Sequence, residues 1–436
     1  MSGTLRPRHL VLSLGALLLV LVGGCGREPR TGIVLDFWAM GTEGEQVQHL
    51  VSRFERAHPN IRVRIQQIPW SAAHEKLLTA FAGDTLPDIF QLGNTWVPEF
   101  VALHALRPLE SALQRSAVLT AGDFFSGILA TNRVDGRLWA LPWYVDTRLL
   151  YYRSDLLAEA GYTAMPDIWA AWLEALGRLR DQGRGERYAI FLPVRDWTAP
   201  VIFAMGLGAT LLRDDDRYGA FRAPEFRRAF ALWVDLFRSG LAPVRSQSET
   251  AGLYRAFGEG RFAMFLSGPW SMRELDRRLP EDLRDAWAAA PIPAPAPGRP
   301  SVSLAGGASL AVSATTDHAD AAWALVEFLL APEQQLAFYH LTGDLPSHRD
   351  AWTRSRLHED PRAAAFWVQL QHVRPTPRIP EWERIADKIA QYGEATVRGR
   401  LDVDEALERL DRDVDVILEK RRWLLDRTRA SGGGAR

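Results

Sequence analysis

The feature that most constrains how this chain folds is the alternation of strand-like and helix-like apolar patterns along it. Residues 33–38 are a short apolar run, and residues 61–65 alternate apolar with polar side chains, both typical of β-strands. Between them, apolar residues from Val47 to Phe54 recur at the spacing of one helix face, and Pro59 ends that helix. Strands that alternate with helices build α/β units, and 436 residues are enough for two lobes. We therefore predict an α/β fold.

The alternation continues through the rest of the chain. We expect one helix after a capping Asp167, one between Pro224 and Gly240, and one over residues 321–330. Each of these helices carries a large aromatic residue on its apolar face, which we expect in the core: Trp172, Trp233 and Trp323.

Two segments are unsuited to regular structure. Residues 291–300 are rich in proline, which lacks a backbone donor, so we expect this segment to lie extended on the surface. Residues 431–436 are rich in glycine and are predicted to form a flexible tail.

The amino terminus has the pattern of a lipoprotein signal peptide. Basic residues come first, residues 10–22 are an apolar run too short to span a membrane comfortably, and Gly23-Gly24-Cys25 follows. Val22 to Cys25 resembles the bacterial lipobox, in which the cysteine is lipidated, and Cys25 is the one cysteine of the chain. We predict a lipoprotein signal peptide over 1–25 and a tether over 26–31. The protein would then lie in the periplasm or on the outer face of the cytoplasmic membrane, held there by the lipid anchor only.

Composition excludes several classes of function. One cysteine leaves no intramolecular disulfide and no cysteine-rich metal site. A formal net charge of −1 provides no global field for nucleic acid, so no nucleic-acid partner is expected. No zinc-protease, phosphate-loop or nucleophile-elbow motif is present, so the sequence indicates no catalytic residue and no cofactor. Some of the 16 tryptophans are expected in the core, and sugar-binding clefts also use aromatic residues, because the C–H face of a pyranose packs on a ring.

One stretch has the spacing of a calcium-binding loop. Asp214, Asp216, Gly219 and Glu225 occupy four of the positions that such a loop requires. Tyr218 stands where a side-chain oxygen is needed, and the glutamate is better explained as the start of a helix. We therefore expect no metal site.

Six strings of residues occur in order along the chain. They are Asp36 to Glu43, Leu86 to Ile89 with Asn94-Thr95-Trp96, Ala140 to Arg153, Ser267 to Trp270, Ala305 to Gly307, and Thr342 to Pro346. Together they resemble the family 1 extracellular solute-binding proteins of ABC transporters, and most closely those that bind maltose or trehalose. The resemblance spans nearly the whole chain after the signal peptide.

This resemblance implies a two-lobed periplasmic-binding-protein fold of type II, with the ligand cleft between the lobes and closure by a hinge. It implies crossings between the lobes near 142–147, near 301–306 and after Leu330. The lobes would comprise 32–143 with 304–330 at the N-terminal side, and 144–303 with 331–430 at the C-terminal side.

The resemblance also implies which residues bind the ligand. Hydrogen bonds to sugar hydroxyls are expected from Glu43, Asn94 and Asp146, and from Arg378 in the C-terminal part. Ring faces are expected from Trp96, Tyr144 and Trp270, and close backbone approach at Gly306 and Gly307. Trp38 ends a strand where ligands bind open α/β sheets, so it is a further candidate. Trp143 lies next to Tyr144, and the sequence leaves open which of the two faces the cleft.

The implied function is that of a monomeric receptor that hands a sugar to the permease subunits of an ABC importer. A non-sugar ligand on the same fold remains an alternative: ferric ion, a polyamine or a phosphoester. Tyr151 and Tyr152 resemble iron-binding tyrosine pairs, although adjacent strand residues point to opposite faces. A periplasmic glycoside hydrolase, which would use two cleft carboxylates, is the second alternative.

Overall fold

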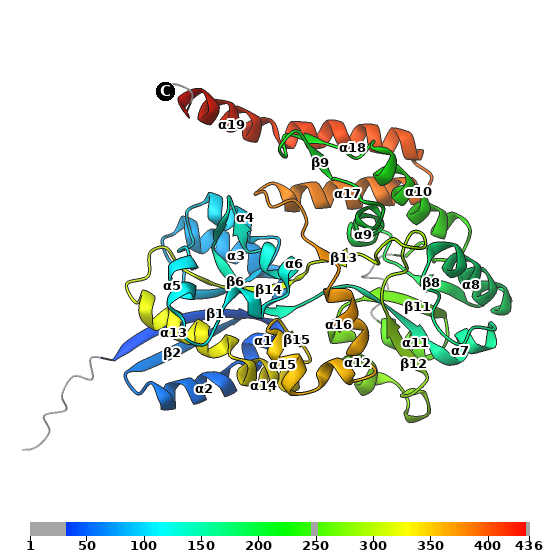
Figure 1. Cartoon of the computed structure of the whole chain (residues 1–436). Helices are drawn as coiled ribbons and strands as arrows, with labels where there is room; N and C mark the ends of the chain where they lie inside the picture. Colours follow the sequence, from blue (N-terminus) through cyan, green and yellow to red (C-terminus); the bar gives the residue numbers. More distant parts are fainter. Residues whose placement is uncertain (1–31, 246–251, 433–436) are drawn as a thin grey trace, which may run out of the picture.

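The computed structural model describes residues 32–245 and 252–432. Two β-sheets covered by helices form two lobes that lie side by side, with the N-terminal part of the chain in one and the green middle part in the other (Figure 1). This confirms the predicted two-lobed α/β fold. The predicted signal peptide, Cys25 and the tether lie outside the described residues. Across the described ranges, none of the helices is both long enough and apolar enough to cross a bilayer.

The N-terminal lobe is built on a mixed six-stranded sheet. Its strands in spatial order are β15 (Leu345–Pro346), β6 (Ala140–Val145), β14 (Gly307–Val312), β3 (Ile89–Gly93), β1 (Ile33–Met40) and β2 (Ile61–Ile68). Strand β1 runs parallel to β2 and β3, whereas β14 is antiparallel to β3 and β6. The alternation predicted for β2 is observed, because Val63 is buried and Arg62 and Arg64 are exposed.

Helices cover both faces of this sheet. One face packs against α2 (Gln48–Ala57), α13 (Ala319–Leu330) and α14 (Pro332–Thr342) through a shared apolar core. The other face packs against α3 (Trp70–Ala82) and α4 (Val97–Ala102). Because both faces are covered, strand β3 is buried along its whole length.

The C-terminal lobe contains a four-stranded sheet. Its strands in spatial order are β12 (Trp287–Ala290), β7 (Leu149–Arg153), β11 (Phe262–Ser267) and β8 (Tyr188–Phe191). Its largest apolar core lies beneath the helices α8 (Trp169–Gln182), α9 (Thr198–Leu207), α10 (Pro224–Arg238), α17 (Trp382–Val397) and α18 (Val403–Ile417). A third core, between the lobes' facing sides, packs α12 (Trp270–Arg278) and α16 (Ala364–Leu370) with α6 (Ser126–Ala130).

The helices predicted from the sequence are observed, and one predicted N-cap residue is wrong. Helix α10 starts at Pro224 and is followed by Gly240, whose φ of 71° is the left-handed conformation that glycine adopts easily. Asp167 does not cap α8, because Ile168 is the N-cap residue and the Asp167 carbonyl accepts a hydrogen bond from Ala294. Of the tryptophans expected in the core, Trp172 and Trp233 are fully buried, and Trp323 is partly buried.

The division of the chain between the lobes differs from the expected one. Helix α14 and strand β15 lie on the N-terminal lobe, although 331–430 was assigned to the other lobe. Phe338 stacks on Trp143 at 4.5 Å, and Leu345 pairs with Val145. Strand β6 remains in the N-terminal sheet through Val145, so the first crossing follows that residue. The third crossing lies beyond β15 rather than directly after Leu330.

Two surface predictions also need correction. In the proline-rich stretch, Ile292 and Ala294 are buried, and Ala294 forms a bridge with Ile168; the exposed part begins at residue 296. Helix α19 (Glu419–Gly432) includes the first two residues of the predicted tail, 431–432. The remaining four, 433–436, lie outside the described residues.

Candidate functional site

A cavity of about 660 Å³ lies between the two lobes. The N-terminal lobe contributes α1 (Gly41–Gln46), the start of α3, β6, β14, the end of α14 and the loop after it, and the C-terminal lobe contributes α12. The residues that line the cavity are Thr42, Glu43, Glu45, Gln46, Trp70, Tyr144, Asp146, Trp270, Arg273, Glu274, Arg277, Gly307, Thr342 and Asp344.

Two of the lining helices begin at the carboxyl ends of strands. Helix α1 follows β1 directly, and α12 follows β11 after Gly268 and Pro269. Each of these strands runs parallel to a neighbour, β1 with β2 and β11 with β8. Ligands bind open α/β sheets outside the carboxyl ends of parallel strands, so the cavity occupies the expected place in both lobes.

Glu43 is held by a chain of donors from the N-terminal lobe. Its side chain is 7% exposed, and its Oε1 accepts hydrogen bonds from Tyr144 Oη at 2.6 Å and Trp70 Nε1 at 3.2 Å. Gln91 Nε2 donates in turn to Tyr144 Oη at 3.2 Å. Burial raises the pKa of Glu43, and these donors oppose the rise. The result is a carboxylate fixed in direction at the cavity wall, which suits it to accept hydroxyl protons.

Asp344 is a buried acid of the cavity with a strongly raised pKa. Burial, followed by the negative charges of Glu43 and Asp146, raises its pKa from 3.8 to about 8. Thr342 opposes the rise through a side-chain hydrogen bond. With this pKa the carboxyl group is mostly protonated at neutral pH and can donate a hydrogen bond. The cavity thus presents an acidic donor beside the carboxylate of Glu43.

Asp146 lies where the chain first crosses between the lobes. Its Oδ1 forms an ion pair with Nη1 of Arg148, and the Arg148 guanidinium lies 4.7 Å from the centre of the Trp270 ring. Burial raises the pKa of Asp146, and the charge of Arg148 opposes this rise. Trp270 is 37% exposed and lines the cavity. The segment between β6 and β7 and the start of α12 therefore bring a carboxylate, a guanidinium and an indole ring together.

Gly306 and Gly307 serve the backbone packing of the crossing strands. A Cβ atom on Gly306 would lie 2.0 Å from the Asp146 carbonyl oxygen, and one on Gly307 would lie 2.3 Å from that of Tyr144. Gly307 also has a φ of 134° and lines the cavity. The expected close approach is therefore present, but the group approached by both residues is the neighbouring strand of the protein.

Tyr144, rather than Trp143, faces the cavity. Trp143 is fully buried in the core against Phe338, whereas the Tyr144 hydroxyl reaches Glu43. The structure thus resolves the ambiguity that the sequence left between these neighbours.

Five of the residues expected to bind ligand do not line the cavity: Gly306, which packs against Asp146, and four others. Trp38 packs beside α3, with Lys76 Nζ 4.9 Å from its ring centre. Trp96 lies behind Trp70, with the two ring centres 5.9 Å apart, and contacts His74. The other two, Asn94 and Arg378, meet in a separate crevice of about 10 Å³, which has room for about one water molecule and is too small for a sugar.

Asn94 and Arg378 hold protein groups in place. Asn94 donates its backbone N–H to Gly307 and accepts a hydrogen bond from Ser309 Oγ at 2.7 Å. Arg378 Nη1 donates to the carbonyl oxygens of Ala130 and Arg133. Both residues therefore connect the crossing segments to the N-terminal lobe.

Several cavity residues were missed by the sequence reasoning. Trp70 and Asp344 belong to this group, together with Arg273 and Arg277 of α12. A signal existed for Asp344, because it lies in the Thr342 to Pro346 string and follows Gly343, whose φ of 86° ends α14. No local pattern marks Trp70, whose role depends on how α3 packs beside α1.

The alternative metal sites are not assembled. Asp214 and Asp216 lie in the turn between β9 (Leu212–Arg213) and β10 (Tyr218–Gly219), and Glu225 lies in the first turn of α10. Tyr151 donates to the Gly268 carbonyl, while Tyr152 packs on the opposite face, as predicted. Within 32–245 and 252–432, no group of three His, Cys, Asp or Glu residues is placed to hold a metal ion.

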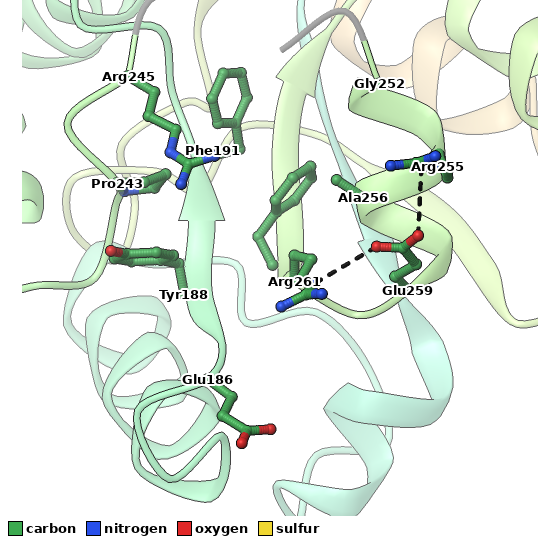
Figure 2. Close-up of a pocket in the computed structure, with 11 residues that line it drawn as sticks. Glu186, Tyr188, Phe191, Pro243, Arg245, Gly252, Arg255, Ala256, Glu259 and Arg261 are labelled. Carbon is green, nitrogen blue, oxygen red and sulfur yellow. Dashed lines mark hydrogen bonds and ion pairs between the residues drawn. The ribbon is translucent and has the colours of Figure 1, made fainter. Parts of the chain in front are cut away.

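A second cavity of about 410 Å³ lies within the C-terminal lobe. Figure 2 shows it between β8, β11 and α11 (Leu253–Gly258), where Glu259 pairs with Arg255 at 3.3 Å and with Arg261 at 3.5 Å. Tyr188, which lines this second cavity, is 41% exposed. Because one lobe alone forms it, a hinge motion between lobes would not enclose a ligand there. The interlobe cavity is therefore the candidate site.

Comparison with known proteins agrees with this geometry. Residues 39–336 match the family described as bacterial extracellular solute-binding proteins. The chain belongs to this family. It is also similar to the sugar-binding protein MalE from Xanthomonas citri, a solved structure with 43% identity and a TM-score of 0.86. That alignment covers 90% of this chain and 99% of MalE.

More distant relatives share the architecture of this solute-binding protein. The diacetylchitobiose binding protein DasA of Streptomyces coelicolor is 24% identical over 417 residues, which is 92% of this chain and 96% of DasA. The GacH receptor of Streptomyces glaucescens, solved unliganded and with acarbose, has 22% identity and a TM-score of 0.78. Its alignment covers 89% of this chain and 99% of GacH. The predicted family and fold are confirmed.

Proposed function

We propose that this protein captures a sugar in the interlobe cavity and delivers it to the permease subunits of an ABC importer. The observation that carries this proposal is the pairing of Glu43, held by Tyr144 and Trp70, with the indole of Trp270 across the cavity. A fixed acceptor near a ring face matches a pyranose, which has hydroxyl groups at its edge and C–H groups on its faces.

The ligand we propose is an α-linked glucose disaccharide of the maltose or trehalose kind. A cavity of about 660 Å³ falls in the size range of small-molecule sites, and it offers both acceptors and donors. Asp344 with its raised pKa and the guanidinium groups of Arg273 and Arg277 would donate, while Glu43 and Asp146 would accept. The similarity to the sugar-binding MalE supports the same ligand class.

We further propose that the protein acts without catalysis, as a monomer. It would be attached to the membrane through lipid on Cys25, in the periplasm or on the outer face of the cytoplasmic membrane. Support for the anchor comes from the sequence Val22 to Cys25. Support for a binding role comes from the family, whose members are named for solute binding.

A thermal-shift screen tests the ligand class. A ligand that binds only the folded state stabilises it by RT ln(1 + [L]/Kd), about 2.7 kcal/mol at a hundredfold excess over Kd. We expect maltose or trehalose to raise the melting temperature, and Glu43→Gln to reduce that rise. Shifts with ferric ion, a polyamine or a glycerophosphodiester and with no sugar would overturn the proposal. Release of glucose from the disaccharide would identify a hydrolase instead.

A further inference from the structure

The last helix of the chain carries a surface that the sugar site does not use. Helix α19 extends α18 and runs out beyond the body of the protein to the C-terminus (Figure 1, red). Its 14 residues include five Lys or Arg and two Asp or Glu, in a chain whose net charge is −1. The helix is therefore a basic segment on a nearly neutral protein.

One side of α19 is fixed to the hairpin formed by β9 and β10. Arg421 Nε donates to the Asp216 carbonyl at 3.1 Å, and Arg422 Nη1 donates to the Arg217 carbonyl at 3.0 Å. Arg217 also forms an ion pair with Asp426. These contacts hold the helix in one rotational orientation, which determines the side chains that point away from the hairpin.

The opposite side, together with Val416 in the last turn of α18, presents an exposed stripe, which we call the outer stripe: Val416, Lys420, Trp423 and Arg427. The spacings of four, three and four residues place these side chains on one helix face. Val416 is 65% exposed and Trp423 is 54% exposed, and Lys420 and Arg427 are exposed as well. The Arg427 guanidinium lies 4.5 Å from the centre of the Trp423 ring. Glu419 borders the stripe without belonging to it.

We propose that the outer stripe docks on the surface of an anionic lipid bilayer. Lysine and arginine side chains near a bilayer are attracted to its anionic headgroups, and their long stems can lie along the interface. Indole rings favour that interface because they combine an apolar body with a polar N–H. The stripe's own charges, Lys420 and Arg427, are both positive, which disfavours pairing with a second copy and favours an anionic partner.

The docking would orient a protein that is already held near the membrane. A lipid at Cys25 would restrict the chain to the bilayer surface. The outer stripe would then be at a high effective concentration near the lipid headgroups, so that even weak docking would be populated. The proposal does not depend on sugar binding, and its test uses protein without the lipid, so its failure is separate from failure of the proposed function.

Vesicle co-sedimentation tests the docking surface directly. The protein from residue 25 onward with Cys25→Ser keeps every residue that the structure describes and has no acyl chain. We expect it to bind vesicles of phosphatidylcholine with phosphatidylglycerol, to bind pure phosphatidylcholine weakly, and to be released by salt. Each basic residue near an anionic surface contributes about fivefold in binding. The double variant Lys420→Glu/Arg427→Glu should therefore bind at least ~30-fold more weakly.

A matched variant separates the stripe from net charge. Arg53 and Arg56 are exposed on α2 in the other lobe, and Arg53→Glu/Arg56→Glu changes the net charge by the same amount. We expect this variant to bind vesicles like the parent, and Trp423→Ala to bind more weakly at low and at high salt. Equal loss in both double variants, no preference for phosphatidylglycerol, or self-association abolished by Trp423→Ala without vesicle binding would each overturn the proposal.

Discussion

Replacing Asp344 by asparagine should stabilise the unliganded protein, and the gain should grow as the pH rises. The pKa of Asp344 is about 8 in the folded protein and about 3.8 when unfolded, because burial and the charges of Glu43 and Asp146 disfavour its ionised form. Between these values the folded state keeps a proton that the unfolded state releases. The stabilising contribution of that proton is complete below the unfolded pKa and is lost as the pH rises through the folded pKa.

The size of the effect follows from the titration. One proton that is bound in the folded state and released in the unfolded state changes the free energy of unfolding by about 1.4 kcal/mol for each pH unit. Wild-type protein should therefore lose about 2.7 kcal/mol from this group between about pH 5 and about pH 7. Asparagine has the shape of the protonated acid and cannot ionise, so Asp344→Asn should not show this loss.

Urea denaturation of wild type and Asp344→Asn at several pH values measures the difference. Asp282→Asn is the matched control, because Asp282 is exposed on the C-terminal lobe. We expect the midpoint of Asp344→Asn to rise above wild type as the pH increases, and the control to follow wild type. A difference that is constant with pH would refute the reasoning, because it would show that Asp344 does not titrate in this range.

Three further changes have specific expected outcomes. Asp146→Ala should weaken sugar binding at least tenfold in a calorimetric titration, since a charge-assisted hydrogen bond contributes ~1.5–3 kcal/mol; unchanged affinity with a lower melting temperature would assign Asp146 to the hinge alone. Gly306→Ala should lower the melting temperature, because its Cβ would lie 2.0 Å from a carbonyl oxygen, whereas Gly177→Ala on open helix surface should not; equal melts would contradict the crowding. Cys25→Ser should release the protein from the membrane fraction, and full retention with unchanged mass would argue against lipidation.

The fold was accessible from the sequence because its signals are local. Apolar periodicity located β1, β2 and α10, and the ordered strings named the family. The lobe boundaries were less accessible, because β15 joins the N-terminal sheet through pairing with β6, a contact nearly 200 residues away in the chain. A two-residue strand such as β15 has no periodic pattern of its own.

The site shows the same division between local and tertiary information. Glu43, Tyr144, Asp146, Trp270 and Gly307 were named from strings and do line the cavity. The sequence does not predict which face of the sheet each side chain of β6 points to, because that strand is buried on both faces and its sequence does not alternate.

Other features of the site arise from tertiary packing. Asp344 owes its raised pKa to burial and to charges from distant parts of the chain, which no local pattern reveals. Trp96 matched the strings equally well but does not line the cavity, whereas Trp70 at the start of α3, whose ring centre lies 5.9 Å from that of Trp96, does.

Titration of maltose and trehalose into three proteins tests the central claim most directly. The three proteins are wild type, Trp270→Ala and Tyr188→Ala. Trp270→Ala removes an aromatic side chain from the interlobe cavity, and Tyr188→Ala removes one from the second cavity of Figure 2. We expect wild type and Tyr188→Ala to bind one of the sugars with equal affinity, and Trp270→Ala to bind it ~10-fold more weakly, since burial of a large apolar side chain contributes about 1.5–3 kcal/mol. Binding that survives in Trp270→Ala and is lost in Tyr188→Ala, or no binding of either sugar to wild type, would contradict the account.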